Sequence, residues 1–286
     1  MKHLISKIAF ITLIAFSSCS KSEEENLPTS ETNLRVKQYS SGGNTVQFVY
    51  NANGKLAQII TPSSTTTYSY NSQGKIIKTE KSNDPNYQYY YSNYTYNSNG
   101  YCTEIITESK SAPSGTIDKY KYVYEYNGTD QPYQSKQYYW DNATNNWSTT
   151  YNQPTSFQYD AIGNVTRVTY EDHYNLYTYD TNGNRLSYQE YYLKSGSTTQ
   201  YFKQRESTYT YDNKKNPWEN LYPRVVKTFR DSKNNNLDLV NKNFNELGAT
   251  ISNSNFSYTY EFNSEGYPTK QTGTDGSVVE FVYEKY

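Results

Sequence analysis

The chain is poor in the residues that build metal centres and disulfide frameworks. Its 286 residues include two cysteines, two histidines and one methionine. The two histidines, His3 and His173, stand far apart and are too few for the ligand set of a histidine-based zinc site. We therefore expect no metal and no cofactor.

A basic excess and a long apolar run are also missing. The formal net charge is −1, so the chain lacks the positive charge with which proteins attract nucleic acid. The apolar run at residues 8–16 is shorter than the roughly 20 residues that cross a bilayer as a helix. No stretch repeats its apolar residues at a helical period. These absences favour an all-β protein with no nucleic-acid partner.

Residues 1–18 have the parts of a secretory signal. Two lysines precede the apolar run, and the small residues Ser17 and Ser18 follow it. Cys19 comes next, and this order resembles the lipobox of bacterial lipoproteins, in which such a cysteine is diacylated and becomes the mature N-terminus. The alternative is an ordinary signal peptide followed by an incidental cysteine. We predict that residues 1–18 are removed and that the lipid on Cys19 anchors the protein to a membrane.

Residues 19–33 have the composition of a flexible tether. They are polar, contain the acidic cluster Glu23-Glu24-Glu25 and show no periodicity, so they cannot bury enough apolar area to offset the entropy of ordering. The acidic cluster is similar to the surface-export signal of lipoproteins in one Gram-negative phylum, and a solvated linker is the alternative. We predict an exported protein anchored in the outer membrane, which the acidic cluster would direct to the cell surface, with a single domain over residues 34–286.

The domain repeats one short unit: an aromatic residue, Asn or Asp, two polar residues and Gly. Asn or Asp at the first position of a type I turn binds backbone donors ahead of it, and Gly takes the left-handed conformation that closes the loop. The unit therefore predicts a β-hairpin turn whose glycine has positive φ. The turn glycines are Gly54, Gly74, Gly100, Gly163, Gly183 and Gly266, and degenerate copies follow Tyr126 and Tyr211.

Alternating tyrosines lead into these turns, and the chain has 36 Tyr against 10 Phe and 3 Trp. In runs such as Tyr68-Ser69-Tyr70, a period of two places the rings on one face of a strand. Thr, Ser, Gln and Lys occupy the other face, which suits water and does not suit lipid. Turns recur about every 20 to 33 residues, which leaves room for two strands in each interval. We predict a water-soluble antiparallel meander of repeated β-hairpins, about 16–20 strands in a large curled sheet that tends to a barrel.

The Tyr-Asp and Tyr-Asn units resemble the tyrosine-aspartate repeats of the Rhs family, and the likeness covers most of residues 46–286. With the lipoprotein start, the whole chain is similar to a family of lipoprotein domains of unknown function described as porin-like in fold. This resemblance implies an antiparallel sheet that curls towards a barrel. It implies no known activity and brings no functional residues.

The residues that could act in catalysis have structural explanations. His173 is the one base available to a Ser or Cys triad, but it stands in a polar run before a strand, where we expect a surface histidine. The carboxylates that could pair for glycan hydrolysis occupy the capping positions of turns. Cys102 has no cationic neighbour in sequence, and we interpret it as a lone packed thiol. We expect no catalytic residue. The capping carboxylates are Asp160, Asp180 and Asp212.

Two segments rich in Asp and Asn, residues 141–146 and 231–236, offer oxygen ligands at close spacing. Both lack the glycine at the sixth position and the terminal glutamate of an EF-hand calcium loop. We interpret both as hairpin loops.

The tryptophans are not among the residues that recur in the repeat unit. Trp140 and Trp147 flank residues 141–146 and should face each other across a hairpin. Tyr138 shares the face of Trp140, while Tyr139 points away. One interpretation is a cross-strand pair that stabilises the hairpin; the other is a site at which a sugar or another flat ligand stacks.

The function that these observations favour is non-enzymatic binding of an extracellular glycan or protein by a membrane-anchored domain. Tyr138, Trp140 and Trp147 are then the ligand-binding residues. The alternatives are a carboxylate-dependent glycan-degrading enzyme and a structural scaffold of tyrosine-aspartate repeats. Two close carboxylates in a groove would favour the enzyme, and an exposed aromatic patch would favour binding.

The lipid anchor can be tested by the substitution Cys19→Ala. We expect the protein to move from the membrane fraction to the soluble fraction, because the sulfur that carries the lipid is gone. Cys102→Ala is the control and should leave the protein in the membrane fraction. A Cys19→Ala protein that stays membrane-bound after a salt wash contradicts the assignment.

Overall fold

A computed structural model describes residues 33–148 and 152–286. The predicted signal peptide, Cys19 and most of the predicted tether lie outside the described residues. Within the described ranges, no helix is long and apolar enough to span a membrane. The strands are β1 (Leu34–Ser41), β2 (Asn44–Tyr50), β3 (Leu56–Ile60), β4 (Thr65–Tyr70), β5 (Ile76–Ser82), β6 (Tyr87–Tyr96), β7 (Cys102–Ser111), β8 (Ile117–Tyr126), β9 (Pro132–Asp141), β10 (Asn146–Trp147), β11 (Asn152–Tyr159), β12 (Val165–Thr169), β13 (His173–Tyr179), β14 (Arg185–Leu193), β15 (Tyr201–Lys215), β16 (Asn234–Phe244), β17 (Thr250–Phe262), β18 (Pro268–Gly273) and β19 (Val278–Lys285).

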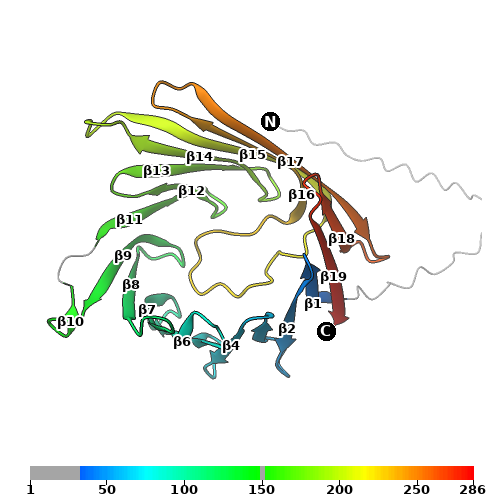
Figure 1. Cartoon of the computed structure of the whole chain (residues 1–286), viewed down its shortest axis with the longest axis horizontal. Helices are drawn as coiled ribbons and strands as arrows, with labels where there is room; N and C mark the ends of the chain where they lie inside the picture. The colour runs from blue at the N-terminus through cyan, green and yellow to red at the C-terminus, as the bar shows by residue number, and fades with distance from the viewer. Residues whose placement is uncertain (1–32, 149–151) are drawn as a thin grey trace, which may run out of the picture. The chain divides into compact units, whose positions relative to one another are not determined.

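Successive strands are antiparallel neighbours, and the last strand pairs with the first, so the sheet closes into a barrel (Figure 1). The closing pair runs from Leu34 opposite Lys285 to Ser41 opposite Val279. β10 pairs with the end of β9, while β11 pairs with β9 directly, which leaves 18 strands around the barrel. The predicted all-β meander is confirmed, and its closure removes both unpaired edges of the sheet.

The barrel has two chemically different ends. Every second connection carries the repeat turn, so these turns gather at one end, which we call the repeat end. Asn33 and Tyr286 also meet there, since the Tyr286 N–H donates to the Asn33 carbonyl at 3.2 Å. We call the opposite end the far end; it holds the hairpin of β9 and β10. The repeat end includes the turns of residues 51–55, 71–75, 97–101, 160–164, 180–184 and 263–267.

The repeat turns form as their sequence dictates. The Asn51 Oδ1 atom accepts hydrogen bonds from the backbone N–H groups of Asn53 and Lys55, both at 3.0 Å. The six repeat glycines have φ between 73° and 88°, the left-handed region in which a side chain is strained. At Gly74 a Cβ would also lie 1.8 Å from Lys55 Nζ, because that ammonium donates to the Gly74 carbonyl at 2.7 Å. Gly74 is therefore required by the backbone conformation of its turn, and a side chain there would also displace the Lys55 ammonium.

One copy of the turn lies at the far end, between β16 and β17. The Asn245 Oδ1 atom accepts from the N–H groups of Leu247 and Ala249 at 3.1 and 2.9 Å, and Gly248 has a φ of 82°. The unit Phe244-Asn245-Glu246-Leu247-Gly248 thus makes the same local structure as the others. It specifies a turn, and it does not specify the end of the barrel at which the turn lies.

Tyrosine hydroxyls hold together strands that no turn joins at the repeat end. Tyr70 ends β4, and its hydroxyl donates to the carbonyl of Leu56, which begins β3, at 2.6 Å. These two strands are joined at the far end, so the bond closes the open side of their hairpin; we call it a tyrosine clamp. Clamps of 2.6–2.8 Å join Tyr50 to Val36, Tyr70 to Leu56, Tyr96 to Ile76, Tyr126 to Cys102, Tyr159 to Pro132, Tyr211 to Arg185, Tyr260 to Asn236 and Tyr283 to Pro268.

The clamps explain why the aromatic residue of the repeat is usually tyrosine. The ring buries apolar area, and the hydroxyl finds a partner in a backbone carbonyl. Burial raises the pKa of Tyr50 to about 12, so its hydroxyl stays protonated and donates at neutral pH. Where Phe262 takes the turn position, Tyr260 on the same face makes the clamp instead.

Residues 216–233 connect β15 to β16 and pass through the ring of strands, as the yellow segment of Figure 1 shows. We call this segment the plug. Its Leu221 is buried in a core cluster with Phe48 and Leu56, and its Trp218 ring lies 5.0 Å from that of Tyr39. Farther along the plug, the Phe229 ring lies 5.1 Å from that of Tyr177. The interior of the barrel is therefore filled in part by a connection between strands.

The plug corrects the interpretation of residues 231–236 as a hairpin loop. Residues 231–233 end the plug, and Asn234 begins β16. The asparagine side chains bond to the neighbouring strand instead of capping a turn: Asn235 Nδ2 donates to Asp212 Oδ2 at 2.9 Å, and Asn234 Nδ2 donates to the Lys214 carbonyl at 2.9 Å. Residues 141–146 do form the hairpin loop expected of them, between β9 and β10.

The outer face of the barrel carries charged pairs. Lys78 and Glu80 on β5 lie 2.6 Å apart, and Lys270 on β18 lies 3.0 Å from Glu261 on β17. These side chains alternate with inward-facing ones, as the period of two requires. Exposed pairs of this kind contribute little to stability, typically about 0–1 kcal/mol. These pairs place charged groups on the face that points away from the core.

The clamp can be tested by Tyr70→Phe. This change removes the donor and leaves the buried Leu56 carbonyl without its partner, so we expect the free energy of unfolding to fall by about 0.5–1.5 kcal/mol. Chemical denaturation measures the change. Tyr133→Phe is the control, because the Tyr133 hydroxyl bonds to Glu125 on the exposed outer face. Equal losses in the two variants would show that the clamp adds nothing beyond a surface hydrogen bond.

Candidate functional site

The structure brings the three predicted ligand-binding side chains together on the outer face near the far end. Trp140 on β9 lies opposite Trp147 on β10, with ring centroids 5.2 Å apart and ring planes at 84°. Tyr138 lies two residues before Trp140 on the same face. Tyr139 contacts Tyr120 instead, with ring centroids 5.4 Å apart. The alternation along β9 therefore places these rings as the sequence predicts.

Two lysines of β8 complete what we call the tryptophan cluster, which consists of Tyr138, Trp140, Trp147, Lys119 and Lys121. Lys119 Nζ lies 4.5 Å from the Trp140 ring centroid and 5.5 Å from that of Trp147. Lys121 Nζ lies 4.9 Å from both Tyr138 and Trp147. At such distances an ammonium group is attracted to the ring face. Sequence analysis missed both lysines, although they alternate with the tyrosines of β8.

The perpendicular tryptophans do not form one flat platform. A sugar would stack on a single ring, beside ammonium groups that can donate hydrogen bonds to its oxygens. Lys119 also lies 3.5 Å from Glu108, so part of its charge is already balanced. The cluster can therefore combine stacking with hydrogen bonding.

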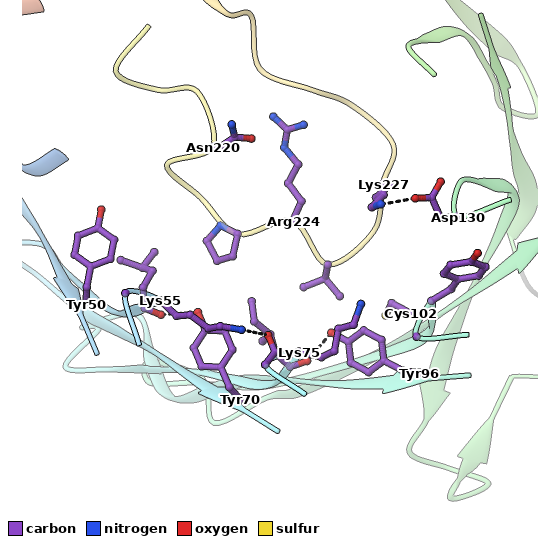
Figure 2. Close-up of a pocket in the computed structure, with 18 of the residues that line it drawn as sticks. Tyr50, Lys55, Tyr70, Lys75, Tyr96, Cys102, Asp130, Asn220, Arg224 and Lys227 are labelled. Atoms are coloured by element: carbon purple, nitrogen blue, oxygen red, sulfur yellow. Dashed lines mark hydrogen bonds and ion pairs between the residues drawn. The ribbon is translucent and has the colours of Figure 1, made fainter. Parts of the chain in front are cut away.

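A second feature lies at the repeat end, where a cavity of about 410 Å³ separates the plug from the first residues of β3, β5 and β7 (Figure 2). We call it the end cavity. Lys55 and Lys75 line it from two successive turns, and Asn220 and Arg224 line it from the plug. Sequence analysis missed this cavity; the recurrence of Gly-Lys at Gly54-Lys55 and Gly74-Lys75 is the signal that could have indicated part of it.

His173 begins β13, as expected of a residue at the start of a strand, but its side chain is not a free surface group. The imidazole is stacked between Tyr170 and Tyr192, with centroids 4.1 and 4.7 Å away and ring planes within 11°. Its Nδ1 atom lies 2.7 Å from Asp172 Oδ1, and this contact holds the pKa of Asp172 below its usual value. The sandwich fixes the ring between strands and gives it a structural role.

The carboxylates of the turns act as caps. Asp160 Oδ1 accepts from the N–H groups of Ile162 and Asn164 at 3.1 and 2.8 Å, and Oδ2 accepts from Asn164 Nδ2 at 2.9 Å. Burial acts to raise the pKa of Asp160, but these hydrogen bonds outweigh it and lower that pKa. Asp180 makes the same set with Asn182 and Asn184. The oxygens of both acids are thus engaged in holding turns.

The third capping carboxylate, Asp212, bonds to the following strand. Asp212 Oδ1 accepts from the N–H groups of Lys214 and Asn235 at 2.9 and 3.0 Å. Among the described residues, no group of three or more His, Cys, Asp or Glu side chains could hold a metal ion. The described acids therefore have structural partners at every position that the sequence proposed for catalysis.

Comparison with known proteins bears on the repeat. Residues 50–87 match the family model RHS Repeat, which confirms the repeat resemblance over that segment. A porin-like protein from Bacteroides vulgatus ATCC 8482 is similar over 88% of this chain and 99% of its own, with 11% identity and a TM-score of 0.46. A porin-like protein from Bacteroides uniformis ATCC 8492 is similar over 87% and 98%, with 14% identity and a TM-score of 0.41.

A more distant likeness joins 80% of this chain to 14% of a chain of the Photorhabdus luminescens Tc holotoxin pore, with 15% identity and a TM-score of 0.30. No curated protein matches the chain. What this chain does therefore has to be inferred from its own contacts.

Cys102 lines the end cavity, and the reactivity of its thiol tests how deeply this side chain is buried. The residue is 1% exposed, and burial raises the pKa of its thiol to about 11, against an ordinary value of 9.0. At pH 8 the thiolate should be roughly a hundredfold scarcer than in the unfolded chain, so a thiol reagent should react at least that much more slowly before denaturant is added. A Cys102→Ser protein serves as the blank. Rapid labelling of the folded protein would contradict this burial.

Proposed function

We infer that the protein is an exported, lipid-anchored barrel that binds an extracellular glycan at the tryptophan cluster without acting as an enzyme. The lipid on Cys19 holds it to the outer membrane, and residues 19–33 serve as the tether. The charged outer face suits a barrel that stands in water and depends on the lipid for its attachment. Exposure on the cell surface follows from the acidic cluster of the tether.

The observation that carries the proposal is the grouping of Tyr138, Trp140 and Trp147 on the outer face with Lys119 and Lys121 over their rings. Aromatic rings provide rigid apolar area to a bound ligand at little cost in conformational entropy. The ammonium groups can donate hydrogen bonds to hydroxyl oxygens of a stacked sugar. A pair that served only to stabilise the hairpin would not need lysines from the neighbouring strand.

A non-enzymatic role is supported by the positions of the acids and of the histidine. Asp160 and Asp180 hold turns, and His173 is sandwiched between two tyrosine rings. General acid and base catalysis needs such groups within reach of a substrate proton. Binding is therefore the better-supported activity.

The test is a glycan array probed with the purified protein, followed by affinity measurements on Trp140→Ala and Trp147→Ala. Each substitution should weaken binding about tenfold to a hundredfold, because losing one aromatic hot-spot residue costs about 1–3 kcal/mol. Circular dichroism checks the fold. Tyr133→Ala is the matched control, since Tyr133 is an exposed outer-face ring on the same strand. Binding that survives both tryptophan substitutions, or an array on which nothing binds, would overturn the proposal.

A further inference from the structure

Two cavities beside the plug are lined by more positive than negative side chains, in a protein whose net charge is −1. A second cavity of about 610 Å³ lies beside the end cavity, and both are bordered by Arg224, Lys227, Asp130 and Asn220. Of the cations at the two cavities, Lys227 pairs with Asp130 and Arg224 pairs with Asp231. The charged residues that line the two cavities are Lys55, Lys75, Arg224, Lys227, Arg230 and Lys233 on the positive side and Asp130, Glu219 and Asp231 on the negative side.

Two lysines that follow turn glycines line the end cavity, and each ammonium group lies near a tyrosine ring. Lys55 Nζ lies 5.4 Å from the centroid of the Tyr70 ring and bonds to the next turn at the Gly74 carbonyl. Lys75 Nζ lies 5.9 Å from the centroid of the Tyr96 ring. Lys75 has no acidic partner within 4.0 Å among the described residues. Its charge is therefore available to an anion that enters the cavity.

The tyrosines of the end cavity offer rings to a ligand. The hydroxyls of Tyr70 and Tyr96 are engaged in clamps at 2.6 Å, so these phenols are held in place before anything binds. Fixed rings next to fixed cations form a preorganised site, and preorganisation lowers the entropic cost of binding. A ring beside an ammonium group suits a ligand that has both a carbon face and a negative charge.

The end cavity is accessible from solvent at the Lys227–Asp130 pair. These side chains are 66% and 42% exposed, and they join the plug to the connection between β8 and β9 (Figure 2). An anionic ligand can take the place of Asp130 as the partner of Lys227. The volume of about 410 Å³ falls within the usual range for small-molecule sites.

We propose that the end cavity binds an acidic saccharide, with its carboxylate or sulfate group held by Lys75 and its sugar ring against the tyrosines. The site differs from the tryptophan cluster in position, since one lies at the repeat end inside the barrel and the other near the far end on the outer face. It also differs in chemistry, because the end cavity requires a charged ligand. The proposal does not depend on glycan binding at the tryptophan cluster.

The test uses isothermal titration calorimetry on the mature lipoprotein in a nonionic detergent that has no sugar headgroup. The acidic probe is trigalacturonate, and maltotriose is the neutral probe of equal length. We expect trigalacturonate to bind, maltotriose not to bind, and the affinity to fall as salt is added, because charges in contact with solvent are screened. Failure of trigalacturonate to bind would overturn the proposal.

Substitutions locate the site. Lys75→Gln should weaken trigalacturonate binding about tenfold, as expected when a hydrogen bond to a charged group is lost. Lys78→Gln is the matched control: it removes the same charge three residues later in the chain, on the outer face of β5 beside Glu80. We expect the control to change the affinity less than twofold. An equal loss in Lys75→Gln and Lys78→Gln would show general attraction instead of a site.

Two further measurements separate the remaining outcomes. Inorganic phosphate that displaces trigalacturonate at equal concentration would reveal an adventitious ion only, and would overturn the saccharide proposal. Trp140→Ala should leave trigalacturonate binding unchanged, which separates this site from the tryptophan cluster. Thermal unfolding checks each variant, and because Lys75 lies outside the plug, Lys75→Gln tests the site without changing a plug residue.

Discussion

The hydrogen bond from a tyrosine hydroxyl to a backbone carbonyl is the interaction on which the rest of this barrel depends. At the repeat end, alternate strand pairs have no turn to join them, and the clamp joins them there. Each clamp satisfies a partly buried hydroxyl and a backbone carbonyl, and such a hydrogen bond contributes about 0.5–1.5 kcal/mol. A sequence that is poor in aliphatic residues can therefore bury tyrosine rings throughout the barrel.

The strand number has a second consequence, because a barrel of 18 strands is too wide for the side chains of its own strands to fill. The plug supplies the missing apolar groups through Trp218, Leu221 and Phe229. Between these anchors it carries cations such as Arg224, which line the space that stays open. The plug therefore contributes both to the apolar core of the barrel and to the lining of its cavities.

The two candidate sites differ in how far local sequence could predict them. Trp140 and Trp147 pair within one hairpin, and Tyr138 follows from the alternation of a single strand, so the sequence alone placed three rings together. Lys121 lies over them because β8 and β9 pair with Lys121 opposite Tyr138, a register set by the whole barrel. The end cavity draws on three turns and the plug, and the recurrent Gly-Lys pair indicates only the part that Lys55 and Lys75 contribute.

The sequence by itself determined the repeat turns and the alternation of side chains along each strand. The turns depend on hydrogen bonds between residues at most four apart, such as those of Asn51 with Asn53 and Lys55. The alternation depends on the local geometry of an extended chain. Tertiary structure decided which end each turn occupies, as the far-end turn at Asn245 shows. It also decided that the sheet closes, that residues 216–233 fold inward, and that asparagines expected in a loop join β16. These outcomes depend on strand number and register, which arise from contacts between residues far apart in the chain, and no short stretch of sequence contains them.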